Sequence, residues 1–300
     1  MLNKHKDNDI MSVVIKMKIL AIGEIIFDVF GNDAEIGGAP LNFCAHAAAE
    51  GAESALISAV GNDPLAFVAK EKIRSFKVKT DFINTNEYPT GKCIVTVKNG
   101  APSYDVISPA AYDFIESDTE KIKSFSPDIF AFGTLIQRNR KSRETLKKIL
   151  SECSFNHIFC DINLRKNCYD KDSCLRCLEN ATILKISNEE EPLLNEFGFY
   201  SKGKTDEETI KNICDSFGNI ELLLFTRGEN GSMVYNAAEE KFYYFDAEKA
   251  DVVSTVGAGD SYSAAFLCEY FKSGNIEKAG IAGSKLSAFV VSHREAVPKK

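Results

Sequence analysis

The 300-residue chain has little cysteine, no long apolar run and no excess of positive charge. Nine cysteines are too few for a disulfide scaffold of this length, and an odd number leaves one unpaired. No apolar run reaches the roughly 18 residues that a membrane-spanning helix needs. The 36 basic residues are outnumbered by 43 acidic ones, and the net charge of −7 argues against binding to nucleic acid or to an anionic membrane.

The N-terminal residues also lack the features of a secretory signal. They are polar and rich in lysine, with only a short apolar patch at residues 11–15 and no small-residue cleavage site. We interpret residues 1–16 as an N-terminal extension and residues 17–300 as a single domain. Without an export signal, we expect reduced thiols and a cytoplasmic protein.

Short apolar runs alternate with helical patterns along most of the chain. The predicted strands are Lys18–Phe30, Ser54–Val60, Asp128–Thr134, His157–Ile162, Ala181–Ile186 and Glu221–Thr226. Helical patterns such as Ser142–Ser151 and Asp206–Phe217 lie between them. Alternation at roughly 25–40 residues predicts an α/β fold with a mostly parallel sheet flanked by helices.

The segment from Asn86 to Phe114 interrupts this alternation. It contains three prolines and glycines at 91 and 100, and Lys92–Lys98 alternates as a half-exposed strand does. We predict an antiparallel flap that projects from the α/β body. An edge hairpin without a role is the alternative.

Several common active-site sequences are missing. The first predicted strand ends in Gly23-Glu24-Ile25-Ile26-Phe27-Asp28, with a single glycine where a dinucleotide-binding protein would carry Gly-x-Gly-x-x-Gly. The Walker phosphate loop, His-Glu-x-x-His and Gly-x-Ser-x-Gly are also absent. These absences disfavour nicotinamide dehydrogenases, metalloproteases and α/β-hydrolases.

The most informative motif present is Gly257-Ala258-Gly259-Asp260, which follows a β-rich stretch and opens an apolar helix. Glycines at a helix start let backbone N–H groups converge on an anion, and the helix dipole favours negative charge there. A carboxylate in that turn would repel phosphate. Its presence is explained if Asp260 removes a proton from a hydroxyl while the amides hold the arriving phosphoryl group. An ordinary glycine turn is the alternative.

Two further glycine turns accompany this motif. Gly37-Gly38-Ala39-Pro40 precedes a helix whose first turn contains Asn42, and the paired glycines let a ligand approach the backbone. Thr226–Gly231 follows a predicted strand and is again rich in glycine. Each turn alone is a weak signal, because loops at strand ends are often of this kind.

Together and in this order, the motifs resemble the PfkB-type (ribokinase-like) carbohydrate kinases, and within them the fructokinase branch. The resemblance runs from Lys18 to Pro298. It is carried by Gly37–Asn42, Ile57–Asp63, Pro89-Thr90-Gly91, Asp161–Arg165, Asn188–Glu191 and, most specifically, Val256–Ser261. It implies a ribokinase-like central, mostly parallel sheet flanked by helices, with a small β lid formed by residues of about 29–37 and 86–114.

The resemblance also implies an activity and a set of site residues. The activity is ATP-dependent phosphorylation of a sugar hydroxyl, with Mg²⁺, and with fructose favoured over 2-keto-3-deoxygluconate, ribose or a nucleoside. Asp260 would be the base and Gly257, Ala258 and Gly259 the anion hole. The sugar would be held by Asp28, Gly37, Gly38, Asn42 and Arg165, the nucleotide by Asn188, Thr226, Gly228, Gly231 and Ser284, and the metal by Glu191.

One departure from the family concerns a cofactor. Ser254 stands where the family usually has the aspartate of a monovalent-cation site, so we expect weak or absent K⁺ binding. Lids in relatives also pair two subunits, and a homodimer is therefore expected. Two other classes stay open, a non-catalytic sugar- or nucleotide-binding regulator and a thiol or zinc protein centred on Cys168–Cys177.

Overall fold

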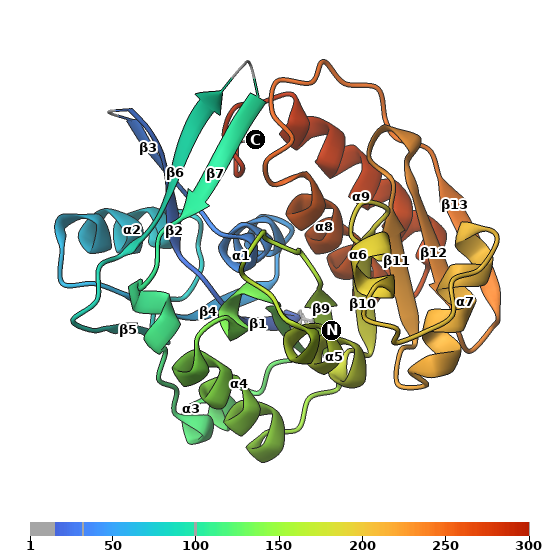
Figure 1. Ribbon diagram of the computed structural model, residues 1–300, viewed down its shortest axis with the longest axis horizontal. Helices are drawn as coiled ribbons and strands as arrows, with labels where there is room; N and C mark the ends of the chain where they lie inside the picture. Colours follow the sequence, from blue (N-terminus) through green and yellow to red (C-terminus); the bar gives the residue numbers. More distant parts are fainter. Residues whose placement is uncertain (1–15, 32, 99–100, 300) are drawn as a thin grey trace, which may run out of the picture.

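The structure is a computed structural model that describes residues 16–31, 33–98 and 101–299 (Figure 1). All of the expected N-terminal extension except Lys16 lies outside the described residues. The strands are β1 (Lys18–Ile22), β2 (Ile26–Phe30), β3 (Asp33–Gly37), β4 (Glu53–Val60), β5 (Ile83–Thr85), β6 (Gly91–Lys98), β7 (Ala101–Val106), β8 (Ile129–Gly133), β9 (His157–Asp161), β10 (Ile183–Ser187), β11 (Leu222–Thr226), β12 (Ser232–Asn236) and β13 (Lys241–Phe245). The α-helices are α1 (Ala39–Ala49), α2 (Pro64–Ser75), α3 (Thr119–Phe125), α4 (Arg140–Glu152), α5 (Lys171–Asn180), α6 (Glu191–Asn195), α7 (Asp206–Ser216), α8 (Ala258–Ser273) and α9 (Ile276–Val291). Three short 3₁₀ turns, η1 (Ala111–Phe114), η2 (Leu135–Gln137) and η3 (Gly228–Asn230), complete the set.

A nine-stranded sheet forms the body, in the order β13-β12-β11-β10-β9-β8-β1-β4-β5. From β11 to β5 every neighbouring pair is parallel, and only β12 and β13 join antiparallel. Most residues of the central strands are apolar because helices cover both faces of the sheet. The predicted α/β class with a mostly parallel sheet is confirmed.

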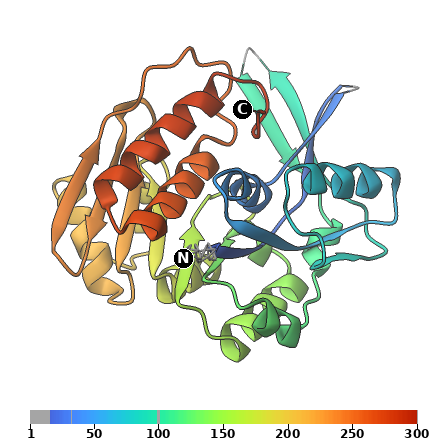
Figure 2. The ribbon, with the colours of Figure 1, turned by 180° about the vertical axis from the view of Figure 1, so that it is seen from behind.

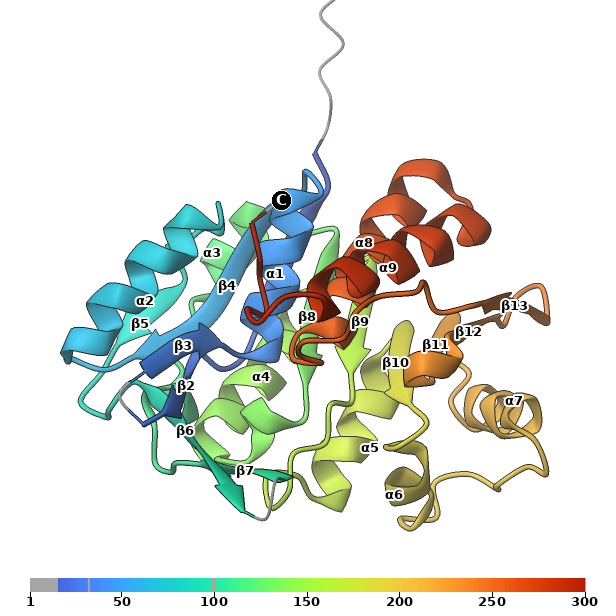
Figure 3. The same cartoon turned by 90° about the horizontal axis from the view of Figure 1, so that it is seen from above.

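Two buried clusters fill the spaces between the sheet and its helices. One contains residues of α1, α2 and α8, and the other contains residues of α4, α5 and α7. Seen from above, α1, α8 and α9 lie on one side of the strands and α4, α5 and α7 on the other (Figure 3). Helices α8 and α9 run side by side, and α8 also packs on α1 (Figure 2). Among the described residues, no helix is long and apolar enough to cross a membrane.

The sequence-based prediction of one strand over Lys18–Phe30 is wrong. The chain leaves the large sheet after Ile22 and enters a second sheet at Ile26, as β2. The apolar pattern continues through the crossing because both strands are buried, so hydrophobicity does not mark the change of sheet. Gly23 makes the crossing possible, since a Cβ at this position would overlap the ring of Pro40.

The second sheet has four strands in the order β3-β2-β6-β7 and projects from the body (Figure 1). Strands β6 and β7 form the antiparallel hairpin predicted within Asn86–Phe114. In β6 the side chains of Cys93 and Val95 are buried, whereas those of Lys92 and Thr96 are exposed, as the alternation predicts.

Asp63 joins the base of this hairpin to the body. Its carboxylate accepts hydrogen bonds from the N–H of Thr90 (2.7 Å) and the hydroxyl of Thr90 (2.8 Å), just before β6. The same carboxylate caps α2 by accepting from the N–H of Ala66 (3.0 Å). One side chain therefore stabilises both a helix start and the entry to the small sheet.

We expect Asp63→Ala to lower the free energy of unfolding by about 1–3 kcal/mol, because it removes a helix cap and leaves the Thr90 N–H without an acceptor. Chemical denaturation measures this change. The matched control is the exposed neighbour Asn62→Ala, for which we expect less than about 0.5 kcal/mol. Equal effects of the two substitutions would contradict the assigned role of Asp63.

Candidate active site

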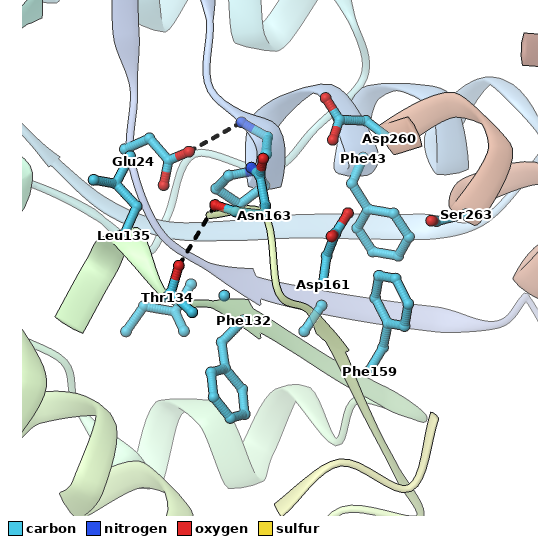
Figure 4. Close-up of a pocket in the computed structure, with 15 residues that line it drawn as sticks. Glu24, Phe43, Phe132, Thr134, Leu135, Phe159, Asp161, Asn163, Asp260 and Ser263 are labelled. Atoms are coloured by element: carbon cyan, nitrogen blue, oxygen red, sulfur yellow. Dashed lines mark hydrogen bonds between the residues drawn. The ribbon is translucent and has the colours of Figure 1, made fainter. Parts of the chain in front are cut away.

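A cavity lies at the carboxyl ends of the central parallel strands, where ligands of open α/β sheets bind. Its polar lining includes Glu24 after β1, Asp161 at the end of β9, Asn163 and Asp260 (Figure 4). Its apolar lining includes Phe43 of α1 and Phe159 of β9, whose rings stack at 5.2 Å between centroids, together with Pro40, Phe132 and Leu135. Hydrogen-bond donors and acceptors beside an apolar wall are the features that a sugar-binding site requires.

Asp260 lies in the first turn of α8 and reaches this cavity. Its Oδ2 accepts a hydrogen bond from Nδ2 of Asn42 in α1 (2.9 Å). Burial raises the pKa of Asp260, while the bond from Asn42 and the positive charge of Lys185 oppose the rise. The Oδ1 atom of Asn42 is buried and has no hydrogen-bond partner in the described chain, so it can accept from a ligand.

The turn before Asp260 leaves donors for an anion. Gly257 has φ +81°, and a Cβ there would lie 2.7 Å from the carbonyl oxygen of Ala296, so the turn requires glycine. Within the described ranges, the N–H groups of Gly259 and Asp260 have no backbone acceptor, as expected in the first turn of a helix. These two donors lie at the N-terminal end of α8, where the helix dipole favours a negative charge.

Glu24 was not singled out from the sequence, although it directly follows the glycine that ends the first strand. It is buried, and its Oε1 accepts from the N–H of Ala39 (3.0 Å) at the start of α1. Burial raises the pKa of Glu24 to about 7. Gly38, with φ +117°, passes so close to the backbone of Glu24 that a side chain would collide with it.

The remaining sugar-side residues come from the small sheet and from the loop after β9. Asp28 lies in β2 next to Gly37 of β3, and burial raises its pKa while the positive charge of Arg165 opposes the rise. Arg165 is exposed, and its charge also acts on Glu24 and Asp260. The structure therefore brings Asp28 and Arg165 to one rim.

The predicted nucleotide residues lie farther along the same edge of the sheet. The N–H of Asn188 donates to the carbonyl of Thr226 (2.9 Å), which ties the ends of β10 and β11. Gly228 and Gly231 both have positive φ, +57° and +79°, in the turn after β11. Ser284 is buried on α9, which packs along α8.

Glu191, the predicted metal residue, does not line the cavity and is engaged by neighbours of its own segment. Its carboxylate accepts from the hydroxyl of Tyr200 (3.2 Å) and from Nζ of Lys202 (3.1 Å). The preceding residue, Glu190, turns toward the cavity side, where it accepts from the N–H groups of Leu164 (3.0 Å) and Ser187 (2.8 Å). In a run of three glutamates, sequence alone does not identify the one that faces inward.

A buried ion pair between β9 and β10 was also not predicted from the sequence. Nζ of Lys185 in β10 lies 3.0 Å from Oδ1 of Asp161 in β9, and both side chains are largely buried. The available signal was a lysine in the middle of the apolar strand Ile183–Ser187, a position where lysine is rare unless paired.

The alternative of a zinc or thiol centre finds no support. Cys168, Cys174 and Cys177 are buried free thiols, and the last two pack into the core from α5. Across residues 16–31, 33–98 and 101–299, no group of three potential ligands could hold a metal.

The residues around Ser254 do not fit a K⁺ site of the family type. The Ser254 hydroxyl accepts from the N–H of Val256 (3.2 Å), and the carbonyl of Val291 is taken by the N–H groups of Val253 (2.8 Å) and Ser254 (3.2 Å). A neutral oxygen and an occupied carbonyl attract a cation less than a carboxylate does.

Comparisons with known proteins agree with this geometry. The model of the pfkB family of carbohydrate kinases matches residues 16–299. An ATP-dependent 6-phosphofructokinase of Thermoanaerobacterium thermosaccharolyticum is 25% identical over 298 residues, 94% of this chain and 90% of that protein. A fructokinase of Salmonella typhimurium is 25% identical over 254 residues, 79% of this chain and 78% of that protein. The crystal structure of an uncharacterized sugar kinase of Pyrococcus horikoshii in complex with ATP has a TM-score of 0.80 at 25% identity, covering 93% of this chain and 94% of that chain.

The family match spans nearly all of the described chain, including the buried carboxylate of Asp260, the glycine turn before it and the cavity at the carboxyl ends of the strands. The chain belongs to the pfkB family of carbohydrate kinases. It is an ATP-dependent sugar kinase with a ribokinase-like fold.

The raised pKa of Glu24 predicts a pH-dependent stability. Between the ordinary value of 4.5 and about 7, the folded state holds a proton that the unfolded state has released. Stability therefore falls as the pH rises through this window, by up to about 3 kcal/mol. We expect Glu24→Gln, which keeps the acceptor for Ala39, to gain stability relative to wild type between pH 5 and pH 8 in denaturant titrations. A difference that stays constant with pH would contradict this.

A second prediction concerns Ser254. A carboxylate about 4 Å from a cation contributes about 1 kcal/mol in water and more when partly buried, which is roughly tenfold in affinity. We expect weak or absent K⁺ activation in wild type and a gain of K⁺ dependence in Ser254→Asp. The measurement compares kcat/KM in KCl with that in tetramethylammonium chloride at equal ionic strength. Saturable activation of wild type by low-millimolar K⁺ would overturn it.

Proposed function

We propose that this protein transfers the γ-phosphoryl group of Mg²⁺-bound ATP to a hydroxyl of a neutral sugar, and that the sugar is fructose. The observation that carries the proposal is the placement of Asp260. Its carboxylate is held by Asn42 at the cavity, in the same turn as the N–H groups of Gly259 and Asp260, which have no acceptor in the described chain.

The reaction follows from this placement. Asp260 accepts the proton of the attacking hydroxyl, so that the oxygen can form a bond to the γ-phosphorus as the bond to the β-phosphate oxygen breaks. The N–H groups of Gly259 and Asp260 stabilise the charge on the transferring group. Mg²⁺ enters on the phosphates of ATP and neutralises part of their charge. The sugar lies between the small sheet, which carries Asp28, and the first turn of α1, which carries Asn42.

The charge around the cavity favours a neutral sugar over an acidic one. Glu24, Asp161 and Asp260 line it and Asp28 lies in the small sheet, whereas Lys185 is a buried cation paired with Asp161 and Arg165 is exposed. Carboxyl groups accept hydrogen bonds from sugar hydroxyls and repel a carboxylate or phosphate on the substrate. This argues against 2-keto-3-deoxygluconate and against a sugar phosphate. The sequence resemblance to fructokinases then favours fructose.

The small sheet is proposed to cover the bound sugar and exclude water, which limits loss of ATP to hydrolysis. Its outer face is proposed to pair with the same face of a second subunit. Both proposals rest on the resemblance and on the projecting position of the hairpin β6–β7 (Figure 1).

The experiment is an ADP-release assay with fructose, 2-keto-3-deoxygluconate, ribose, a nucleoside and fructose 6-phosphate, with the product identified by ³¹P NMR. We expect kcat/KM for fructose to exceed the others at least tenfold. A preference for either acidic substrate would contradict the charge argument. Sugar-dependent thermal stabilisation without any turnover would instead favour the non-catalytic regulator.

The base itself is tested by Asp260→Asn. We expect kcat to fall by about 10²–10⁴, as on loss of a general base, with nucleotide binding roughly intact. Because burial raises the pKa of Asp260, wild-type activity should fall on the acid side at a pH above the ordinary range of aspartate, and the variant should lack this limb. Near-normal turnover of the purified variant would refute the assignment.

A further inference from the structure

Lys185 occupies an unusual place for a lysine. It lies in β10, in the interior of the large sheet, between apolar neighbours Leu184 and Ile186. Its side chain is 9% exposed, and Asp161 is its direct partner in the register of β9 and β10. Replacing a buried ion pair with apolar residues is often neutral or stabilising, so stability alone does not account for this pair.

The ammonium group touches the anion-binding turn. A Cβ placed on Gly259 would lie 3.1 Å from Nζ of Lys185 and 3.6 Å from its Cε. Gly259 thus leaves the space that Lys185 occupies. The lysine approaches the same turn in which, among the described residues, two N–H groups have no acceptor. A fixed positive charge and two backbone donors lie together at the start of α8.

The hydrogen bonding of Lys185 is incomplete. An ammonium group has three donors, and in the part of the chain that the structure describes its one hydrogen-bond acceptor is Oδ1 of Asp161 (3.0 Å). Burial alone would lower the pKa of Lys185, but the negative charges of Asp161 and Glu190 raise it above its usual value, so the group stays charged. Buried donors of a charged group are costly when unused.

A second buried ion pair of this chain provides the contrast. Arg138 binds both carboxylate oxygens of Asp113, at 2.7 and 2.8 Å, and donates to the carbonyl of Ile107 (3.0 Å). Its guanidinium also lies over the ring of Tyr112. The donors of Arg138 thus bind acceptors of the protein itself and connect the segments that carry Asp113 and Ile107, as expected of a structural ion pair. Lys185 keeps donors beside the anion-binding turn instead.

From these observations, we propose that Lys185 is a catalytic residue that donates hydrogen bonds to the oxygens of the phosphoryl group during transfer. The proposal rests on the proposed kinase reaction. As the sugar oxygen bonds to phosphorus and the bond to ADP breaks, the hydroxyl proton goes to Asp260. Lys185 keeps its own proton and stabilises the negative charge. Asp161 holds the ammonium in place and is a positioning residue.

The first test distinguishes the effect of losing the positive charge of Lys185 during phosphoryl transfer from the effect of losing its packing. We expect Lys185→Met to lower kcat by about 10²–10³, the usual loss when one preorganised donor is removed, with the KM for ATP changed only a few-fold. It should also lower the melting temperature, because Asp161 is left buried and unpaired. In the double variant Asp161→Asn/Lys185→Met, the melting temperature should recover while kcat stays low. Recovery of both would show a structural pair and overturn the proposal.

Arg138→Met is the matched control. It breaks a buried pair of comparable burial, so it should lower the melting temperature without the large loss of kcat at temperatures where the variant is folded. An equal loss of kcat in this control would mean that breaking any buried ion pair disables the enzyme. The loss of kcat in Lys185→Met would then not indicate a catalytic role, and the proposal would be refuted.

Two further measurements do not require the variants to have a normal turnover rate: rescue by an added amine and thermal stabilisation by an analogue of the transferring group. Ethylammonium should restore part of the turnover of Lys185→Ala, in a saturable manner, and have no such effect on Arg138→Ala. Mg²⁺·ADP with aluminium fluoride and fructose, an analogue of the transferring group, should raise the melting temperature of wild type and not that of Lys185→Met. Absence of rescue together with an unchanged shift in Lys185→Met would overturn the proposal.

Failure of the proposed substrate is distinguishable from failure of this inference. If fructose is wrong, wild type shows no turnover with it, and the comparison of wild type with Lys185→Met is made with the sugar that the panel selects. Stabilisation of wild type by Mg²⁺·ADP and aluminium fluoride, lost in Lys185→Met, supports the role of Lys185 whichever sugar is the substrate.

Discussion

The packing of α1 against α8 is the constraint on which the site depends. These helices are 218 residues apart at their point of contact, where Asn42 donates to Asp260. The contact places Asp260, from the C-terminal part of the chain, beside Asn42 in the first turn of α1, from the N-terminal part. The starts of both helices are also fixed by close backbone approaches, of Gly38 to Glu24 before α1 and of Gly257 to Ala296 before α8. A side chain at either glycine would collide with that neighbouring backbone.

The parallel sheet below these helices gives the site its electrostatic character. Strands β1, β8, β9 and β10 end at one edge, so that Glu24 and Asp161 line the same cavity as Asp260 of the first turn of α8. The stacked rings of Phe43 and Phe159 form an apolar wall of the cavity. Charges in such surroundings interact more strongly than in water, and a small number of them decides which substrates are accepted.

Much of the fold could be predicted from the sequence because the central strands are apolar on both faces and are separated by helical patterns. The turns around Gly38 and Gly257 could be predicted because left-handed backbone requires glycine there. Other features depend on three-dimensional contacts. The break after Ile22 is hidden because both sheets bury the same apolar run, and the choice between Glu190 and Glu191 depends on how a short helix turns. The pairing of Lys185 with Asp161 depends on two strands being neighbours, which spacing along the chain does not encode.

The crossings between the two sheets have a mechanical consequence. The chain enters the small sheet at Gly23–Ile25 and returns at Gly37–Gly38, and the bond from the Ala39 N–H to Glu24 fastens these two crossings to each other. The third crossing, at Thr90, is fastened to the body by Asp63. The fourth, after β7, is fastened by the bond from Arg138 to the carbonyl of Ile107 (3.0 Å). The small sheet is thus fixed to the body at every crossing rather than joined by a flexible tether. Because Ala39 begins α1, the crossing at Gly37–Gly38 connects this sheet directly to the helix that carries Asn42, and through Asn42 to the carboxylate of Asp260.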